Sequence, residues 1–358
     1  MIRILDKYIL KKFLSAFVFV VILLVLIILV IDIAEKLEKF NRNNLSFGEI
    51  FEYYLDFIPF IANLITPITV FIATVIVTAK MASHSEIIAI LSSGSSFIRM
   101  LVPYIMGSII IAGVSFYLTG WVIPVSNKSR LAFENEYLRS TYYFDKKNFH
   151  IQVGPNEYLY MQSYSNQANV GYKFAIDWIE GNELKEKLTA KRIEWNPEKE
   201  LWTLKHWKRI KILPNGEQFS YGSSMDTTLI IHPKEFESDY RMYESMTIPE
   251  LQAFITSLES RGAEGKETYV IELYARYTSP FAVIVLTFIG VIVSARKSRG
   301  GAGFPIALGF LMSFIFILFF IMAKGIAEAG NMHPLLAVWL PNIIFGIIGS
   351  IMYKTVPR

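Results

Sequence analysis

Long apolar runs are the feature that most constrains how this chain can fold. A helix of about 20 apolar residues crosses the roughly 30 Å hydrocarbon core of a bilayer, and six runs have this character with few or no charges. We therefore predict an α-helical multi-pass membrane protein with six transmembrane helices. Prolines such as Pro67 and Pro305 fall inside spans, which membrane helices tolerate. The predicted spans are Phe13–Ile33, Phe60–Ala79, Leu101–Ile123, Tyr269–Ser294, Ala302–Ala323 and Leu335–Met352.

The sequence excludes several kinds of chemistry. The chain of 358 residues contains no cysteine, so it has no disulfide, no thiolate metal site and no cysteine nucleophile. Its five histidines are scattered without H-x-x-x-H spacing, and no G-x-S-x-G motif is present. The nearest approach to a phosphate-binding loop, Gly262–Glu267, lacks the spacer and the hydroxyl residue of a Walker A motif. We therefore predict no catalytic residue, no metal and no cofactor.

Lysine and arginine residues near the span ends predict the orientation, because cytoplasmic loops carry an excess of them. The short loops on one side hold only Lys36, Lys39, Arg42 and Lys324. We predict an inner-membrane protein with both termini in the cytoplasm and the segment between the third and fourth spans in the periplasm. The richer side receives Arg3, Lys7, Lys11, Lys12, Lys80, Arg99, Arg296, Lys297, Arg299, Lys354 and Arg358.

The long polar segment between spans three and four has the pattern of β-strands. Apolar side chains alternate with polar ones from Tyr172 to Trp178, and Trp202, Leu204, Ile210 and Ile212 share one parity. Such alternation indicates strands with one buried face. Turn signals separate the runs, and regular hairpins of this kind favour a sandwich, a jelly roll or an open barrel. The turn signals are Gly181-Asn182, Asn196-Pro197 and Pro214-Asn215-Gly216.

A short amphipathic helix is predicted after these strands. Thr247 and Glu250 have the spacing of a capping box, and Arg261-Gly262 is a plausible end. Apolar residues follow at helical spacing: Leu251, Phe254, Ile255 and Leu258. The predicted domains are 1–123 with three spans, 124–246 with the β-rich domain, 247–268 with the connecting helix and linker, and 269–358 with three further spans.

The loop between spans two and three contains a second short helix, near residues 84–94. Ile87, Ile88 and Leu91 would form an apolar stripe, Gly94 would end the helix, and Glu86 suits the dipole at its start. One interpretation is an interfacial helix that lies on lipid. The other is a coupling helix that docks into a cytoplasmic partner. The candidate residues for that contact are Ser85, Glu86, Ile87, Leu91 and Gly94.

Charges also gather at the outer end of span one, where Lys36, Lys39 and Arg42 follow Asp32. Charges at a span end commonly anchor the helix in the interface. The functional alternative is contact with an anionic lipid headgroup in the outer leaflet. At the outer end of span five, Lys324 lies four residues before Glu328, as in an i,i+4 pair.

Several short motifs give the chain a resemblance to a known family. They are Leu5-Asp6-Lys7-Tyr8-Ile9, Ser85-Glu86 with Ser93-Gly94, Arg299-Gly300-Gly301 and Leu340-Pro341-Asn342. Together with three spans on each side of an outer β domain, they make nearly the whole chain similar to the LptF/LptG-type permeases of the lipopolysaccharide-export ABC transporter. The opening residues favour the LptG branch, although the sequence does not decide between the LptG-like and the LptF-like half.

The resemblance implies a function and a set of partners. The β domain would be a periplasmic jellyroll that passes acyl chains onward, and spans one and five would form lateral gates. A homologous LptF-like permease would pair with this chain, or a second copy of it. A cytoplasmic LptB-like ATPase dimer would grip the coupling helix at Glu86, and LptC- and LptA-like proteins would extend the jellyroll line. No nucleic acid is expected.

One residue departs from the family pattern, and two other functions stay open. Relatives carry a basic residue near the position of Asp32, whereas the basic residues here come later. This difference affects the headgroup contacts that the resemblance implies. The alternatives are a membrane-bound enzyme that modifies envelope lipid and an envelope sensor or scaffold whose outer domain binds a partner. Co-purification of an ATPase would separate the transporter from both.

Overall fold

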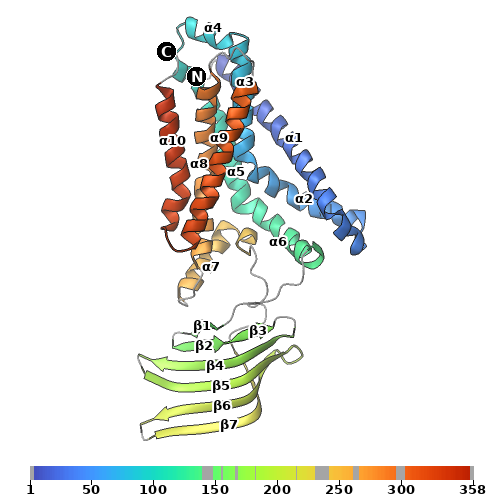
Figure 1. Ribbon diagram of the computed structural model, residues 1–358, viewed down its shortest axis with the longest axis vertical. Coiled ribbons are helices and arrows are strands. Elements are labelled where there is room, and N and C mark those ends of the chain that lie inside the picture. The colour runs from blue at the N-terminus through green and yellow to red at the C-terminus, as the bar shows by residue number, and fades with distance from the viewer. Residues whose placement is uncertain are drawn as a thin grey trace. The chain divides into compact units, whose positions relative to one another are not determined.

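The computed structural model describes most of the chain as two compact units. A helical unit comprises Met1–Leu138, Tyr243–Gln252 and Glu267–Arg358, and a sheet unit comprises Arg139–Met242 and Ala253–Lys266. Figure 1 shows the helices of the first unit and the strands of the second. The described residues are 4–138, 148–154, 156–165, 168–181, 183–214, 216–229, 242–260, 266–295 and 303–354.

Long apolar helices build the helical unit. Six helical segments of the described chain are long and apolar enough to cross a membrane, which confirms the predicted fold class. Helix α4 lies at the same end of this unit as the start of α1 and the end of α10 (Figure 1). The helices are α1 (Ile4–Arg42), α2 (Phe47–Leu64), α3 (Thr66–Ser83), α4 (Glu86–Ser92), α5 (Phe97–Tyr117), α6 (Ile123–Phe133), α8 (Lys266–Ser294), α9 (Gly303–Glu328) and α10 (Pro334–Tyr353).

The predicted span Phe60–Ala79 combines parts of two helices. Ile65 separates α2 from α3, and Pro67 lies in the first turn of α3, at the start of the span Thr66–Ser83. Proline suits that position because the missing N–H would have no partner within the helix. Helix α2 begins at a capping box, in which Ser46 and Glu49 bond reciprocally and lower the pKa of Glu49.

The third span continues beyond its predicted end. A π-helical turn, η1 (Leu118–Val122), follows α5, and a second one, η2 (Glu134–Leu138), follows α6. A π turn inserts one extra residue and often marks a functional position. The chain therefore remains helical from Phe97 to Leu138, although its first turn beyond the predicted span already carries polar residues.

Two glycines permit close approach between helices in the main core. A Cβ on Gly309 of α9 would lie 2.6 Å from the ring of Phe71 on α3. A Cβ on Gly107 of α5 would lie 2.6 Å from the ring of Phe13 on α1. Phe13, Phe71 and Tyr104 are fully buried in this core. Small residues at such contacts are typical of helices that pack inside a membrane.

The sheet unit contains one antiparallel sheet with the order β1-β2-β4-β5-β6-β7 in the described residues, and β3 also pairs with β4. One of its faces carries a core that includes Leu159, Phe174, Ile176, Trp202 and Leu204. The strands are β1 (Phe149–Gly154), β2 (Glu157–Met161), β3 (Ser163–Ser165), β4 (Val170–Glu180), β5 (Glu183–Asn196), β6 (Leu201–Leu213) and β7 (Gly216–Thr227).

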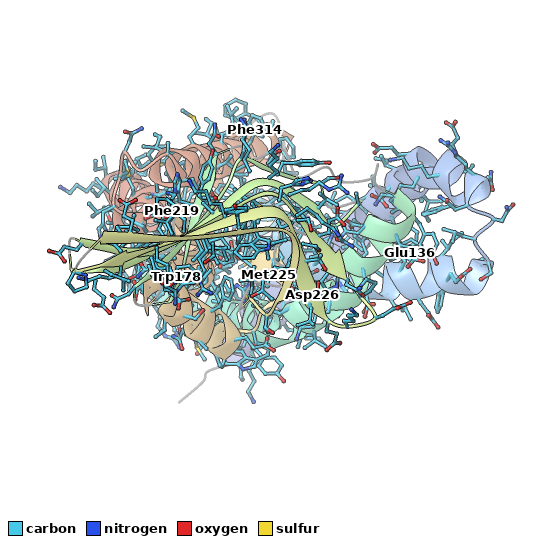
Figure 2. The ribbon with its side chains drawn as sticks, turned by 90° about the horizontal axis from the view of Figure 1, so that it is seen from below. Glu136, Trp178, Phe219, Met225, Asp226 and Phe314 are labelled. Carbon is cyan, nitrogen blue, oxygen red and sulfur yellow. The ribbon has the colours of Figure 1, made fainter. Side chains whose placement is uncertain are left out.

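The predicted alternation is confirmed along parts of the strands. Phe174, Ile176, Trp202 and Leu204 are buried, whereas Ile212 near the end of β6 is 41% exposed. Neighbours on β7 point to different surroundings: Met225 packs against the core, and Asp226 bonds to Thr203 and Lys199. Figure 2 labels both residues together with Trp178 and Phe219 of the same sheet.

The predicted turns coincide with strand ends. Strand β5 ends at Asn196, Gly181 has a left-handed φ of +61°, and Gly216 opens β7 with φ +136°. Asn182 and Asn215 lie outside the described residues, as do Arg261-Gly262, Gly262–Gly265 and Arg299-Gly300-Gly301.

The connecting helix is present as α7 (Ile248–Ser260). The Thr247 amide and hydroxyl both donate to Glu250 Oε2, at 2.7 and 2.8 Å. These bonds, with a further one from Lys128, lower the pKa of Glu250 to about 2. Leu251 is fully buried and Ile255 nearly so, which confirms the predicted apolar stripe.

Candidate functional sites

Helix α4 is a short element held between two left-handed residues. Ser85 precedes it with φ +59°, and Gly94 follows it with φ +84°. An L-residue with a side chain rarely adopts this conformation, so glycine suits the end of the helix. The structure thus places a short helix where the sequence predicts one, within residues 84–94.

Glu86 is bonded to the first helix rather than standing alone. Tyr8 Oη donates to Glu86 Oε2 at 3.0 Å, and Lys12 Nζ lies 3.2 Å from Oε1. His84 Nδ1 lies 3.9 Å from the same oxygen. The carboxylate therefore ties α4 to the start of α1. This pairing could not be predicted from the sequence, because the partners are more than 70 residues apart.

The apolar residues of α4 divide between two faces. Ile87 is buried and Leu91 is half-buried, and both pack in the main helical core. Ile88, which the sequence placed on the same stripe, is 54% exposed. Residues 87 and 88 project about 100° apart on a helix, so the core receives only one of them. The exposed residues of α4 are Ile88, Ala89 and Ser92, and His84 is exposed just before the helix.

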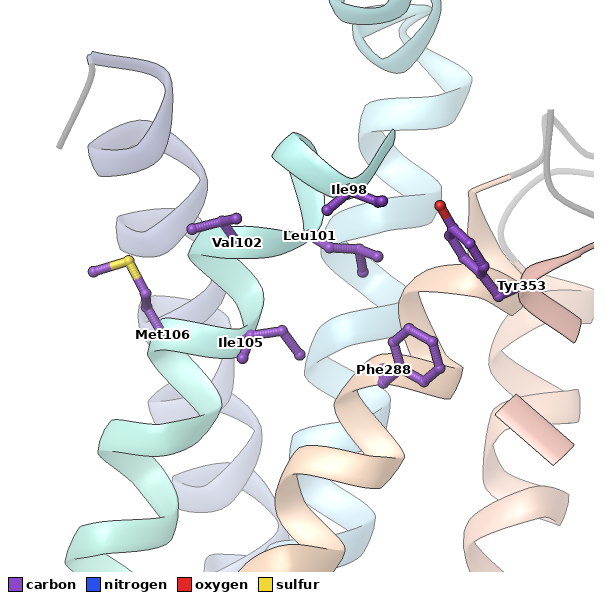
Figure 3. A pocket seen from close by; sticks show the side chains of 7 residues that line it. All are labelled: Ile98, Leu101, Val102, Ile105, Met106, Phe288 and Tyr353. Carbon is purple, nitrogen blue, oxygen red and sulfur yellow. The ribbon is translucent and has the colours of Figure 1, made fainter. Parts of the chain in front are cut away.

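An apolar groove opens at the same end of the helical unit. Its volume is about 470 Å³ and its lining contains no polar surface. In the close-up of Figure 3, Ile98, Leu101 and Ile105 of α5 lie on the side of Phe288 of α8 and Tyr353 of α10. Val102 and Met106 point to the other side of α5. Beside it, Arg99 at the start of α5 donates to the buried Asp6 of α1 at 2.5 Å. The lining residues are Ile98, Leu101, Val102, Ile105, Met106, Phe288 and Tyr353.

At the other end of α1, Lys36 is engaged inside the chain. Its Nζ donates to Asp32 Oδ2 at 2.8 Å and to Tyr53 Oη at 2.7 Å. Tyr54 Oη donates to the same Asp32 oxygen at 2.8 Å. Burial raises the pKa of Tyr53 and Tyr54, so both stay protonated. Asp32 is thus the acidic partner of Lys36.

Lys39 and Arg42 lie on the exposed side of the same helix end. Lys39 Nζ donates to the carbonyl oxygen of Leu138 at 2.9 Å. Because a carbonyl oxygen is uncharged, this bond does not neutralise the charge of Lys39. Of the three predicted headgroup ligands, the structure brings Lys36 inward and leaves Lys39 and Arg42 accessible. Lys36 and Lys39 therefore differ in surroundings despite their helical spacing.

A buried charge network adjoins Lys36. Tyr53 Oη donates to Glu134 Oε1 at 3.2 Å, and Arg130 Nη1 donates to the same oxygen at 2.8 Å. Arg130 Nη2 donates to Glu244 Oε2 at 2.9 Å. The Arg130 side chain is only 2% exposed. A charge removed from water in this way must be paired to be tolerated.

A second buried network joins α8 and α9. Lys324 Nζ lies 3.1 Å from Glu272 Oε2, so its ion-pair partner is on α8 rather than Glu328. Glu272 Oε1 also accepts from Arg276 Nε at 3.3 Å. Sequence reasoning missed Glu272 and Arg276, although charged residues at the start of an apolar span are the available signal. Nearby, the buried Asn342 donates to the Thr278 carbonyl at 3.2 Å.

Comparison with known proteins decides the family. A family model described as lipopolysaccharide export system permease LptF/LptG matches residues 7–355. The chain belongs to this family. The LptF/LptG permease is a multi-pass membrane component of an ABC transporter whose substrate is lipopolysaccharide, and it is not an enzyme. The match does not distinguish LptF from LptG. No individual curated protein matches the chain.

Proposed function

We propose that this LptF/LptG permease is moved by a separate ATPase, draws lipopolysaccharide out of the inner membrane, and passes it through the sheet domain toward the outer membrane. The observation that carries the proposal is the family match over residues 7–355. Six apolar helical segments and an inserted antiparallel sheet, present in the described residues, agree with it. The permease itself breaks no bond, so its contribution is mechanical.

The energetics explain why both an ATPase and an apolar receiving surface are needed. Each methylene that leaves an apolar environment costs about 0.8 kcal/mol, so a lipid with several acyl chains does not leave the bilayer unaided at a useful rate. One face of the sheet carries an apolar core that includes Phe174, Ile176, Trp202 and Leu204. We propose that the sheet, within the predicted domain 124–246, offers the acyl chains such a surface and that 247–268 connects this domain to the last three spans.

Helix α4 is the proposed contact with the ATPase. It is short, lies at the end of the helical unit with the start of α1, and exposes Ile88, Ala89 and Ser92. Its buried residues, Ile87 and Leu91, join it to the main core. A push on α4 would therefore reach α1 through Glu86 as well as through packing.

We expect Glu86→Ala to reduce ATP-driven lipopolysaccharide release by about fivefold or more, the lower end of common coupling energies. Loss of the carboxylate frees α4 from Tyr8 and Lys12. The ion pair is about one-third exposed and contributes at most about 1 kcal/mol to stability, so the fold should survive. Lipid release and ATPase co-purification are measured in parallel. Lys11→Ala, an exposed neighbour on α1, is the control. Unchanged release with unchanged association in the Glu86 variant would end the coupling role.

The proposed orientation has both termini in the cytoplasm and residues 124–268 in the periplasm. The excess of lysine and arginine at the α4 end of the spans supports it. We expect a reporter that is active only outside the cytoplasm to be active when fused at Gly216 and inactive when fused after Arg358. A cytoplasmic signal at Gly216 would contradict the orientation.

The proposed partners follow from the transporter class. We propose a homologous LptF-like permease, or a second copy of this chain, together with an LptB-like ATPase dimer and LptC- and LptA-like periplasmic proteins. The opening Leu5-Asp6-Lys7-Tyr8-Ile9 supports the LptG branch for this chain. Purification of the tagged protein in mild detergent, with identification of the proteins that accompany it, tests these assignments. Recovery without any ATPase would contradict the proposed complex.

We further propose that the outer end of α1 contacts the phosphates of lipopolysaccharide. Lys39 and Arg42 are exposed beyond the apolar part of the helix, and Lys36 lies behind them in contact with Asp32 and Tyr53. The two accessible cations are the direct ligands in this proposal, while Lys36 holds α1 against α2.

A further inference from the structure

A buried arginine binds the segment that follows the sheet domain in the sequence. This return segment, Tyr243–Met246, includes most of the short 3-10 helix η4 (Met242–Ser245). Arg276 of α8 donates through Nη1 to the Met246 carbonyl at 2.5 Å and through Nη2 to the Tyr243 carbonyl at 2.6 Å. The guanidinium is 3% exposed and is neutralised by Glu272.

The other side of the return segment is held by α6. Arg130 Nη2 donates to the Glu244 carboxylate at 2.9 Å, and Asn127 Nδ2 donates to the Glu244 carbonyl at 3.0 Å. Lys128 pairs with Glu250 at 3.1 Å just beyond the segment. At the π turn, a Cβ on Gly120 would lie 3.0 Å from Ile248, so the absence of a side chain gives that residue room.

The two sets of hydrogen bonds to the return segment come from different halves of the helical unit. Helix α6 continues the third span, whereas α8 is the fourth. An arginine presents several donors in a fixed planar fork, so Arg276 binds two carbonyls and a carboxylate at once. A lysine has one nitrogen and would keep the charge without spanning both carbonyls. The burial of Arg130 and Arg276 makes each grip persistent, because neither side chain has water as an alternative partner.

We propose that Arg276 and Arg130 are positioning residues that fasten the return segment to both halves of the helical unit. A movement of one half against the other then pulls directly on the polypeptide that leads out of the sheet domain. The inference rests on the proposed ATP-driven movement and deepens it. It identifies the return segment as the place where the movement of the helices is passed to the chain that comes from the sheet domain.

The test compares two variants, each of which replaces one of the two cations that pair with Glu272. Arg276→Lys keeps a positive charge beside Glu272 but loses the two-carbonyl grip. Lys324→Gln removes the other cation of Glu272 and leaves the two bonds from Arg276 to the return segment in place. The intact transport complex is placed in proteoliposomes, and lipopolysaccharide released per ATP hydrolysed is measured. We expect at least about a fivefold fall for Arg276→Lys, with hydrolysis retained, and an unchanged ratio for Lys324→Gln.

A crosslink provides a rescue that a merely structural role would not predict. The rings of Tyr243 and Tyr269, the latter on α8, lie 6.3 Å apart, and the chain has no native cysteine. In the Arg276→Lys background, Tyr243→Cys and Tyr269→Cys are joined by a short bis-maleimide, with cysteine-free partner subunits. We expect joining to restore most of the ratio and the unjoined thiols to leave it low.

Two results would overturn the fastening role. One is a normal ratio in Arg276→Lys, and the other is a low ratio that the crosslink does not raise. A wild-type complex that hydrolyses ATP without releasing any lipid would refute the proposed transport mechanism as well. That outcome is distinguishable because it appears before any substitution is made.

Discussion

Replacement of Arg130 by methionine is expected to destabilise the helical unit by about 3–5 kcal/mol, the usual cost of removing one partner from a buried ion pair. Methionine fills part of the volume, so the main effect is electrostatic. The carboxylates of Glu134 and Glu244 would lose the cation that lies 2.8 and 2.9 Å from them. Thermal and denaturant unfolding of the detergent-purified protein would measure the loss.

The neighbouring Lys128 supplies a matched control on the same helix. Its ion pair with Glu250 is about half exposed, with side-chain exposures of 54% and 48%, and exposed pairs contribute at most about 1 kcal/mol. Lys128→Met should therefore leave stability nearly unchanged. Equal stabilities of the two variants would show that the network around Arg130 does not hold this region together.

The double substitution Lys39→Glu with Arg42→Glu is expected to weaken lipopolysaccharide binding by more than about tenfold. Each cation near an anionic surface contributes about 1 kcal/mol, about 1.4 kcal/mol is one decade of affinity, and the new carboxylates add repulsion. Lys36 is left in place because Asp32 and Tyr53 already engage it. Equilibrium binding of lipopolysaccharide to the purified protein and photocrosslinking from position 39 are the measurements.

The opposite end of the same helix offers the control for charge alone. Lys7 and Lys11 are exposed near the start of α1, and their replacement by glutamate changes the net charge equally. Binding should then stay within about twofold of the wild type, since screening limits the reach of a distant charge to about 10 Å. Equal losses at both ends would indicate a non-specific effect and move the headgroup site elsewhere.

The spans were predictable because their signal is local. A run of apolar side chains such as Leu101–Ile123 needs no knowledge of its neighbours. The break at Ile65 was not predictable in the same way. Residues 60–79 carry no charged side chain, and nothing in that stretch shows that Phe57 and Ile61 turn toward a separate cluster with Phe40. Packing between distant segments decides where the helix ends there.

The site residues also divide into features that local residue types predict and features that tertiary packing decides. Helix α4 and its end at Gly94 follow from local residue types, and the structure contains both. The partners of Glu86 and Lys36 do not, because Tyr8 and Tyr53 are brought near only by tertiary packing. A sequence shows which side chains carry charge at a span end. It does not show which of them face inward, as Lys36 does, and which remain exposed, as Arg42 does.

Helix α1 has a further consequence that depends on its length. It is one uninterrupted helix of 39 residues without proline or glycine, and at about 1.5 Å per residue it is roughly 58 Å long. A continuous helix of this length transmits a tilt at one end to its other end, because no break along it can absorb the change. A tilt of about 5° applied where Tyr8 and Lys12 meet α4 would displace the Lys39 end by about 4 Å. A small angular change at one surface of the membrane thus becomes a displacement of several ångströms at the other.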